Sequence, residues 1–333
     1  MKRIVITGYG SIGRRHARLI KAEQPETELV VVRRHCDEPL EIDGAECLER
    51  LDDALALKPD AAIVAGPASF HLEQALTCLE AGVPVLIEKP LSVDAQNLES
   101  LLQARDRAGV PVMVGYNLRH LPVITALRQA VLEGSVGRVC HVHAEVGQYL
   151  PDWRPQQDYR QTVSAQARLG GGVLLELSHE LDYLCWIFGA PLWVQAWLGR
   201  RGSLEIDVED TAIITLGFAG SDIVASVRLD FLRRDTTRRC EVVAEKGSLC
   251  MDAITGTLKR RSAGDCVDEL HNATAERDYT YIRQMQRFFN CVESGYRTSS
   301  LEQGIAVMKL IDAIRLSARQ GRRVDVDVEW PHG

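Results

Sequence analysis

Short apolar runs alternate with helical patterns along the first third of the chain. Runs of small and β-branched apolar residues predict strands at Ile4–Thr7, Leu29–Val32, Ala61–Ala65, Val85–Ile87 and Val112–Gly115. Between them, apolar residues recur with helical spacing, which predicts helices at Ser11–Lys21, Phe70–Ala81 and Asp94–Ala108. Strands separated by helices are typical of a parallel sheet covered on both faces, and right-handed crossovers favour a doubly wound α/β topology.

The pattern changes character near Asn117–Pro122. A helix at Val123–Glu133 leads into runs that alternate as strands do, at Val139–Gln148, Val194–Leu198, Asp210–Phe218, Ile223–Asp230, Arg239–Glu245 and Ser248–Asp252. Turns at Ala219–Asp222 and Lys246–Gly247 predict hairpins, and helices at Tyr281–Glu293 and Leu301–Ala318 close the chain. We therefore expect an α/β domain over residues 1–120 and an α+β domain with a mostly antiparallel sheet over residues 121–333.

Composition limits the classes of protein to which the chain can belong. Of its 333 residues, 46% are hydrophobic and 26% are charged, which is ordinary for a soluble globular enzyme. The formal net charge is -7, so we expect no nucleic-acid partner, because phosphate binding favours a basic surface. Apolar runs fall short of the roughly 20 residues that span a bilayer. The chain also begins directly with a strand pattern, so we expect neither a leader nor a membrane partner.

Cysteine and histidine spacing gives no metal or disulfide framework. Nine cysteines are scattered without a CxxC pair, and we expect them all to be reduced thiols in a cytoplasmic protein. The run Cys140-His141-Val142-His143 would place two histidines on one face of a strand. A zinc site is one interpretation, but no third ligand follows at a suitable spacing. An ordinary sheet face is the favoured alternative, so we expect no metal.

A glycine-rich segment, GYGSIG, directly follows the first strand and opens a helix. In that position Gly8 permits a tight turn, Gly10 lets the backbone approach a pyrophosphate, and Gly13 lets the helix pack against the strand. Amides at the start of the helix, at Ser11 and Ile12, are donors for phosphate oxygens. The alternative is a glycine turn without a ligand, but the strand–turn–helix context favours a dinucleotide-binding Rossmann domain.

The end of the second strand selects between NAD and NADP. An acidic residue there would bind the adenosine ribose hydroxyl and favour NAD, but the chain has Arg33 and Arg34, with no acid before Asp37. Guanidinium groups make charge-assisted, forked contacts with phosphate oxygens, which favours the 2′-phosphate of NADP. The alternative is a solvated basic turn.

Five motifs lie along the chain: GYGSIGRRH at the start, PASFH at Pro67–His71, EKPLS at Glu88–Ser92, GYNLRHLP at Gly115–Pro122 and the GGG-led segment at Gly170. Together they resemble one enzyme family, the Gfo/Idh/MocA oxidoreductases. The resemblance implies a Rossmann domain, then an open-faced sheet domain that forms a homodimer or homotetramer, with the substrate held between the domains. It also implies oxidation or reduction of a hydroxyl or carbonyl group on a sugar, polyol or sugar derivative.

The resemblance also assigns roles to residues of the motifs. Lys89 of Glu-Lys-Pro is expected beside the nicotinamide and the substrate, where an ammonium group stabilises negative charge developing on oxygen. The bond before Pro90 is commonly cis in the family. The cofactor contacts that the resemblance implies beyond the glycine loop are Pro67, His71, Glu88 and Asn117, and the substrate contacts are Tyr116 and Arg119.

The segment Gly170–Phe188 is predicted to form one helix that carries the second catalytic element. A helical wheel places Glu176, His179, Glu180 and Tyr183 on one side, opposite a buried stripe of Leu174, Leu177, Leu181, Leu184, Cys185 and Phe188. His179 is the candidate general acid/base, Glu176 its orienting group, and Tyr183 a substrate contact. The commoner family pattern has an aspartate four residues before the histidine, whereas this chain has a glutamate three residues before it.

The irregular segment Tyr149–Leu169 is rich in Gln, Arg and aromatic residues. Such segments often carry binding residues, so Trp153, Arg154 and Tyr159 are candidate substrate contacts. An oligomer-contact loop is the alternative. The LSHELDYL and GQYLPDWRP stretches also resemble a family branch associated with bacterial surface sugars of the nonulosonate type.

We expect, in sum, an NADP-preferring oxidoreductase acting on CH–OH groups. Two alternatives stay open at this stage. One is a redox-neutral enzyme, similar to a glycosidase, that recycles a bound cofactor. The other is a dinucleotide-binding sensor without catalysis, although the presence of both Lys89 and His179 argues against it.

Overall fold

The chain forms two compact units in the computed structural model, which describes residues 1–218, 222–263 and 266–331. Unit 1 contains Met1–Tyr116, Tyr281–Ile305 and Pro331, and unit 2 contains Asn117–Thr280 and Ala306–Trp330. The chain therefore returns to unit 1 after forming most of unit 2. The sequence-based division at residue 120 does not include this second segment of unit 1.

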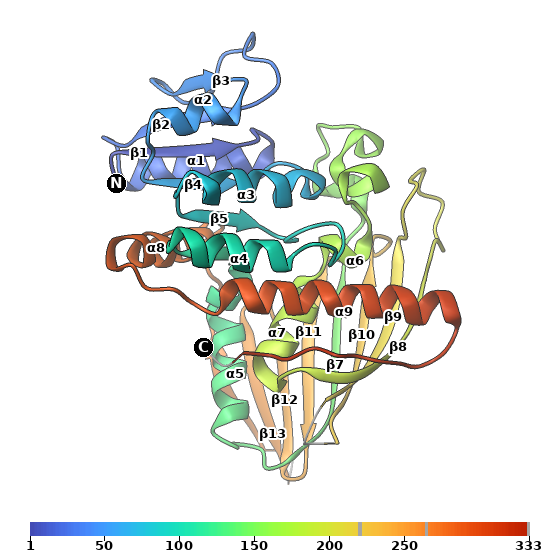
Figure 1. Cartoon of the computed structure of the whole chain (residues 1–333). Helices are drawn as coiled ribbons and strands as arrows, with labels where there is room; N and C mark the ends of the chain where they lie inside the picture. The colour runs from blue at the N-terminus through green and yellow to red at the C-terminus, as the bar shows by residue number, and fades with distance from the viewer. Residues whose placement is uncertain (219–221, 264–265, 332–333) are drawn as a thin grey trace. The chain divides into compact units, whose positions relative to one another are not determined.

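Unit 1 is built on a parallel sheet (Figure 1). In the described residues its strand order is β3-β2-β1-β4-β5-β6, and every pairing is parallel. The strands are β1 (Arg3–Thr7), β2 (Glu28–Val32), β3 (Glu46–Leu48), β4 (Ala61–Val64), β5 (Val85–Glu88) and β6 (Val112–Gly115). This confirms the doubly wound sheet. β3 is a short edge strand with partly exposed side chains, so it lacks the apolar run that identifies the others.

The helices of unit 1 are α1 (Ser11–Glu23), α2 (Leu51–Ala56), α3 (His71–Glu80), α4 (Glu99–Ala108) and most of α8 (Tyr279–Ser294). Met285, Phe288 and Phe289 of α8 are buried in one core cluster with Ile4 and Ile6 of β1. An amphipathic helix needs an apolar surface to cover, but its own sequence does not say which sheet supplies that surface. For this reason α8 belongs to unit 1 although it lies late in the chain.

Unit 2 contains a mixed but mostly antiparallel sheet, as predicted. Its order in the described residues is β14-β13-β12-β11-β7-β10-β9-β8-β15, and β7 and β10 form its parallel pair. The strands are β7 (Val139–Gly147), β8 (Pro191–Gly199), β9 (Thr211–Phe218), β10 (Val224–Asp230), β11 (Thr237–Ala244), β12 (Gly247–Asp252), β13 (Thr257–Ser262), β14 (Val267–Asn272) and β15 (Val324–Asp325). Of the two predicted hairpin turns, Lys246–Gly247 joins β11 to β12, whereas residues 219–221 lie outside the described residues.

One face of this sheet is covered by helices α5 (Pro122–Leu132) and α7 (His179–Phe188), which also contact each other. Strand β7 alternates accordingly: Val142 and Ala144 are buried, and His141 and His143 are exposed. The remaining helices are the short α6 (Val173–Glu176) and the long α9 (Ser300–Gln320). Single 3₁₀ turns lie at Ala68–Phe70, Asn117–His120, Leu150–Trp153, Tyr159–Gln161, Val163–Ala165 and Ala167–Leu169.

Candidate functional site

The glycine loop between β1 and α1 is shaped by close backbone contacts. Gly8 has a φ of +84°, and a Cβ added there would lie 2.6 Å from Cα of Gly66. A Cβ on Gly13 would lie 2.1 Å from the carbonyl oxygen of Gly8, whereas one on Gly10 would meet nothing within 4 Å. The N-cap residue of α1 is Gly10, which has no side chain with which to cap the helix. The loop therefore offers open space at the start of α1, which fits the pyrophosphate of a dinucleotide.

Tyr9 lies between two arginines in this loop. The guanidinium of Arg14 is 5.5 Å from the centre of its ring, and that of Arg33 is 5.7 Å from it. Arg14 is neutralised by the carboxylate of Glu41 at 2.6 Å, and the amide of Glu41 donates to the hydroxyl oxygen of Tyr9 at 3.2 Å. Arg34 is exposed, with its guanidinium 5.7 Å from the centre of the Phe70 ring. Of the two predicted phosphate-binding arginines, Arg33 thus lies against Tyr9 of the glycine loop and Arg34 against Phe70 of the turn after β4.

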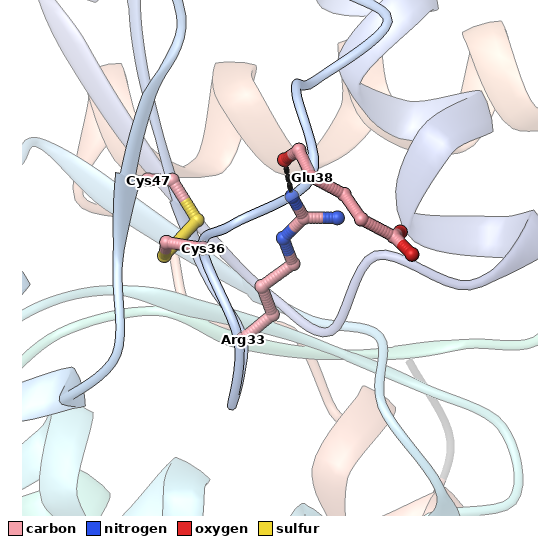
Figure 2. The surroundings of a disulfide bond; sticks show 4 residues. All are labelled: Arg33, Cys36, Glu38 and Cys47. Carbon is pink, nitrogen blue, oxygen red and sulfur yellow. Dashed lines mark hydrogen bonds between the residues drawn. A yellow bond between two sulfur atoms is a disulfide. The ribbon is translucent and has the colours of Figure 1, made fainter.

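A disulfide joins Cys36 to Cys47 in the same region, with their Cα atoms 5.7 Å apart (Figure 2). The expectation that every cysteine is a reduced thiol is therefore wrong for this pair. Cys47 lies opposite Val31 in the parallel pairing of β2 with β3, and the loop after β2 brings Cys36 back to it. Strand pairing and loop path create the contact, so no sequence spacing indicates it. The other seven cysteines are free.

Glu88 is held at the end of β5 by side chains from two helices. Its Oε1 lies 2.7 Å from Nε2 of His16 in α1 and accepts from Nε2 of Gln284 in α8 at 3.2 Å. Glu88 is 6% exposed and His16 is 0% exposed. A Cβ on Gly115 would lie 2.9 Å from Oε2 of Glu88. Sequence reasoning missed His16 and Gln284 as partners of Glu88, because they lie far from it in the chain.

Lys89 and Pro90 follow Glu88 directly, and the peptide bond between them is cis. His71 supports this turn: its Nδ1 lies 2.8 Å from the carbonyl oxygen of Pro90 and its Nε2 lies 2.9 Å from that of Gly66. Burial lowers the pKa of His71, against the opposing effect of these two carbonyl groups. The ring of His71 thus joins the turn after β4 to the turn after β5, and Pro67 precedes the 3₁₀ turn between them.

In unit 2, two predicted ligand contacts have partners within the protein. Asn117 donates from Nδ2 to the hydroxyl of Thr280 at 2.8 Å and is buried. Arg119 donates from Nε and Nη2 to the two carboxylate oxygens of Asp182 in α7. Its guanidinium is also 5.5 Å from the ring centre of Trp330. Arg119 therefore connects its loop to α7 and to the C-terminal segment. This is a structural role, and it differs from the substrate contact that the sequence predicts.

Close contacts explain why glycines occupy the GGG segment at residues 170–172. Gly172 has a φ of +106°, and a Cβ there would lie 2.5 Å from Oε1 of Glu209, the oxygen that accepts from the amide of Leu174. A Cβ on Gly171 would lie 2.3 Å from the carbonyl oxygen of Val163. Only residues without a side chain allow both approaches. These glycines also mean that α6 begins at Val173.

The single helix predicted over Gly170–Phe188 is wrong, because α6 ends at Glu176 and α7 begins at His179. The wheel drawn for one continuous helix fails for Glu180 and Tyr183, both of which are 0% exposed. Glu180 accepts from Nε of Arg238 in β11 at 2.8 Å. Burial raises the pKa of Tyr183 well above its usual value.

The two proposed catalytic residues of this segment, Glu176 and His179, are more exposed than Glu180 and Tyr183. Glu176 is half-buried at the end of α6, and His179, which is 9% exposed, is the first residue of α7. The structure describes Lys89 and Tyr116 in unit 1, with Tyr116 buried, and describes Glu176 and His179 in unit 2. Their proposed roles stay predictions.

The irregular segment before the GGG run forms successive 3₁₀ turns anchored to unit 2. Trp153 donates from its indole nitrogen to the carbonyl of Gln148 at 3.3 Å and packs edge-on against Phe231. The Tyr159 hydroxyl accepts from the amide of Glu205 at 3.1 Å. Arg154 is half-buried. These contacts explain how the segment is held in unit 2. The substrate contacts of Trp153, Arg154 and Tyr159 stay predictions.

The exposed histidines of β7 form no evident metal centre. His143 lies 2.9 Å from the hydroxyl of Ser226 through its Nδ1. Within residues 1–218, 222–263 and 266–331, no three His, Cys, Asp or Glu side chains are grouped as a metal ion would require. Over the same residues, no helix combines the length and apolar character needed to cross a membrane.

Comparison with known families matches the two-unit architecture. The description "Oxidoreductase family, NAD-binding Rossmann fold" matches residues 2–116, and "GFO/IDH/MocA C-terminal domain" matches residues 124–250. The chain belongs to the GFO/IDH/MocA family. It is thus an oxidoreductase with an NAD-binding Rossmann domain.

Individual dehydrogenases are similar to this chain along most of its length. Inositol 2-dehydrogenase of Rhizobium meliloti (strain 1021) is 25% identical, covering 97% of this chain and 99% of its own. D-glucoside 3-dehydrogenase of Escherichia coli (strain K12) is 24% identical, covering 82% and 81%. Among solved structures, levoglucosan dehydrogenase in complex with NADH has a TM-score of 0.86 at 20% identity, covering 98% and 99%.

A second solved structure has the same fold. The WlbA dehydrogenase from Bordetella pertussis, in complex with NADH and UDP-GlcNAcA, has a TM-score of 0.82 at 23% identity. The match covers 99% of this chain and 100% of that one. At these identities the two structural matches show that the fold is shared along nearly the whole chain, from the Rossmann sheet to the antiparallel sheet.

Proposed function

We propose that the protein is an NAD(P)-dependent dehydrogenase that acts on a CH–OH group of a sugar, polyol or sugar derivative. The observation that carries this proposal is the open space at the glycine loop after β1. This loop lies in the same parallel sheet as the Glu88-Lys89-Pro90 turn at the end of β5. Ligands of such sheets bind at the carboxyl ends of the strands, where both features lie. Relatives named inositol 2-dehydrogenase and D-glucoside 3-dehydrogenase support the substrate class.

Each group of site residues has its own part in the proposed chemistry. When bound, the nicotinamide supplies or accepts the hydride at its C4 atom. Gly8, Gly10 and Gly13 admit the pyrophosphate, with the amides of Ser11 and Ile12 as its donors. Lys89 stabilises the negative charge that develops on the reacting oxygen. His179 exchanges the proton of that oxygen with solvent, and Glu176 orients the imidazole ring.

Some sequence-based assignments change in this proposal. Tyr183 is omitted as a substrate contact because its side chain is fully enclosed. His71 supports the Pro90 turn through its ring rather than contacting the dinucleotide, and Arg119 supports α7 through Asp182. Tyr116, Trp153, Arg154, Tyr159, Pro67 and Asn117 keep their proposed roles.

The proposed cofactor preference is for NADP. Arg33 and Arg34 follow β2 directly, where the adenosine ribose of a dinucleotide is expected. Replacing Arg33 with Asp removes a guanidinium and adds a ribose-hydroxyl acceptor, so the ratio of NADPH affinity to NADH affinity should fall. An unchanged ratio would contradict the NADP preference while leaving the dehydrogenase proposal intact.

The proposed partner is a second copy of the chain. The outer face of the unit 2 sheet exposes apolar side chains, including Leu192, Ile213 and Val224, and large apolar residues exposed on neighbouring strands favour an interface. Light scattering of the purified protein would give the number of subunits. A cytoplasmic location and the nonulosonate branch stay predictions.

Reduced-nicotinamide absorbance over time tests the proposed activity. Wild-type protein, Lys89→Ala and Lys246→Ala would be assayed with NADP⁺ and NADPH against sugars, polyols and nucleotide sugars. Lys246 is an exposed turn residue of unit 2 and is the matched control. Turnover in wild type and Lys246→Ala that is lost in Lys89→Ala supports the proposal.

Absence of turnover with every compound of the panel would favour the two alternatives instead. A redox-neutral enzyme would retain its cofactor through gel filtration and turn over without added nucleotide. A sensor would bind cofactor without any turnover. The two relatives and the solved structure described above are named dehydrogenases, which does not favour either alternative.

A further inference from the structure

The loop after β2 is fastened to β3 at two points. The backbone amide of Arg33 donates to the carbonyl of Leu48 at 3.0 Å, and the Cys36–Cys47 disulfide closes the loop three residues later. The hydrogen bond secures the backbone of Arg33 whether or not the disulfide is present. The disulfide secures the stretch from Cys36 to Cys47, whose ends are 11 residues apart in the sequence.

The side chain of Arg33 depends on that stretch. One Nη atom donates to the backbone carbonyl of Glu38, two residues beyond Cys36. In Figure 2 the dashed line joins the guanidinium to this carbonyl, while the carboxylate of Glu38 extends in another direction. Nε of Arg33 is buried and has no hydrogen-bond partner among the residues that the structure describes. The guanidinium is thus held through one Nη atom, and its remaining N–H groups are donors that this contact does not use.

Charge explains why the path of this loop matters. The loop carries four exposed carboxylates, on Asp37, Glu38, Glu41 and Asp43. Glu41 is neutralised by Arg14 at 2.6 Å, and Glu38 presents a carbonyl rather than its carboxylate to Arg33. If the loop were free to move, Asp37 or Glu38 could pair with Arg33 in competition with a phosphate. The closed loop keeps these carboxylates off the guanidinium.

We propose that the Cys36–Cys47 disulfide determines dinucleotide selectivity by holding Arg33 ready for the 2′-phosphate of NADP. This inference rests on the proposed function. Opening the disulfide frees the acidic loop, which weakens binding of the phosphorylated dinucleotide more than binding of NADH, because NADH lacks the 2′-phosphate that Arg33 contacts. Cys36 and Cys47 act through Arg33 and are positioning residues.

The redox step involves a thiol–disulfide exchange. A dithiol reductant transfers two electrons to the disulfide, its own two sulfurs become a disulfide, and Cys36 and Cys47 each take up a proton. In the reverse direction a low-molecular-weight disulfide accepts the two electrons and is released as two thiols. Selectivity for NADP would therefore depend on the thiol–disulfide balance around the protein.

Equilibrium fluorescence titration with NADPH and with NADH tests the inference. The samples are oxidised wild type, wild type with a dithiol reductant, the Cys36→Ser/Cys47→Ser variant, and a Cys140→Ser/Cys266→Ser control at two exposed free cysteines. We expect the ratio of NADPH affinity to NADH affinity to fall about tenfold on reduction and in the first variant, the scale of one charge-assisted hydrogen bond. The ratio of the control should equal that of oxidised wild type, and the first variant should not respond to reductant.

The outcomes separate this inference from the proposed function. A ratio that is equal in the oxidised, reduced and Cys36→Ser/Cys47→Ser proteins would overturn the inference alone. Equal losses of NADPH and NADH affinity would also overturn it, since they indicate a general loss of structure. Failure of oxidised wild type to bind either dinucleotide would overturn the proposed function. Retained NADH binding in the variant shows that its loop and sheet have folded.

Discussion

Arg119 and Asp182 form a forked ion pair inside unit 2, with Nε to Oδ2 at 2.9 Å and Nη2 to Oδ1 at 2.6 Å. Asp182 is 1% exposed. Burial raises the pKa of its carboxyl, and the guanidinium of Arg119 opposes that rise. The pair connects the 3₁₀ turn at Asn117–His120 to α7, the helix that begins with His179.

Breaking this pair from one side should be costly. Arg119→Met leaves a buried carboxylate without its counter-charge, and we expect the free energy of unfolding to fall by about 3–5 kcal/mol. Chemical denaturation would measure the loss. The Arg119→Met/Asp182→Leu double variant removes both charges and should recover a large part of it. A double variant that is as unstable as the sum of both single variants would contradict the ion-pair interpretation.

Gly172→Ala should destabilise the start of α6. The new Cβ needs an unfavourable φ and pushes against Glu209, which caps the amide of Leu174, so a loss of about 2–4 kcal/mol is expected. Gly134→Ala is the matched control, because Gly134 has a φ of +66° but nothing within 4 Å of an added Cβ. Thermal unfolding compares them. If both variants lose the same Tm, the contact with Glu209 is not the cause.

His71 should make stability depend on pH. Its folded-state pKa is lowered below the model-peptide value of 6.5 by burial, so the ring is neutral in the fold and protonation favours the unfolded chain. The stability is fully present above pH 6.5 and is lost as pH falls through the folded pKa. Within that window the slope is at most about 1.4 kcal/mol per pH unit.

Thermal unfolding at a series of pH values from about 7.5 to about 5 would measure this dependence. His71→Asn should lose stability at neutral pH and show a shallower slope than wild type. His141→Asn, at an exposed position of β7, should keep the wild-type slope. A His71→Asn slope equal to that of wild type would assign the pH dependence to other groups.

His179→Ala tests the proposed acid/base directly. Turnover should fall by about 10²–10⁴-fold, the usual contribution of a positioned proton donor, whereas dinucleotide affinity should change little. Steady-state kinetics and cofactor titration measure the two quantities. His271→Ala, in β14, is the control and should turn over as wild type does. Wild-type turnover in His179→Ala would remove the histidine from the mechanism.

Periodicity and motif spacing predict the strands of unit 1 that lead into the glycine loop and the Glu88-Lys89-Pro90 turn. Val85–Ile87 is a continuous apolar run, so it predicts a buried parallel strand, and the structure extends it to Glu88. The requirement for Gly13 is equally local, since a Cβ there would meet the carbonyl oxygen of Gly8 in the same loop. These features depend on residues close together in the chain, and for that reason they can be predicted from the sequence.

The pairings that hold those elements arise from the tertiary fold. His16 meets Glu88 because α1 packs beside the end of β5, and Cys36 meets Cys47 because β3 pairs with β2. In the same way, a helical wheel places Glu180 and Tyr183 on an open face, whereas the packing of α7 on the sheet encloses both. A local pattern specifies which face of an element is apolar. The residues that meet that face come from distant parts of the chain, so only packing selects them.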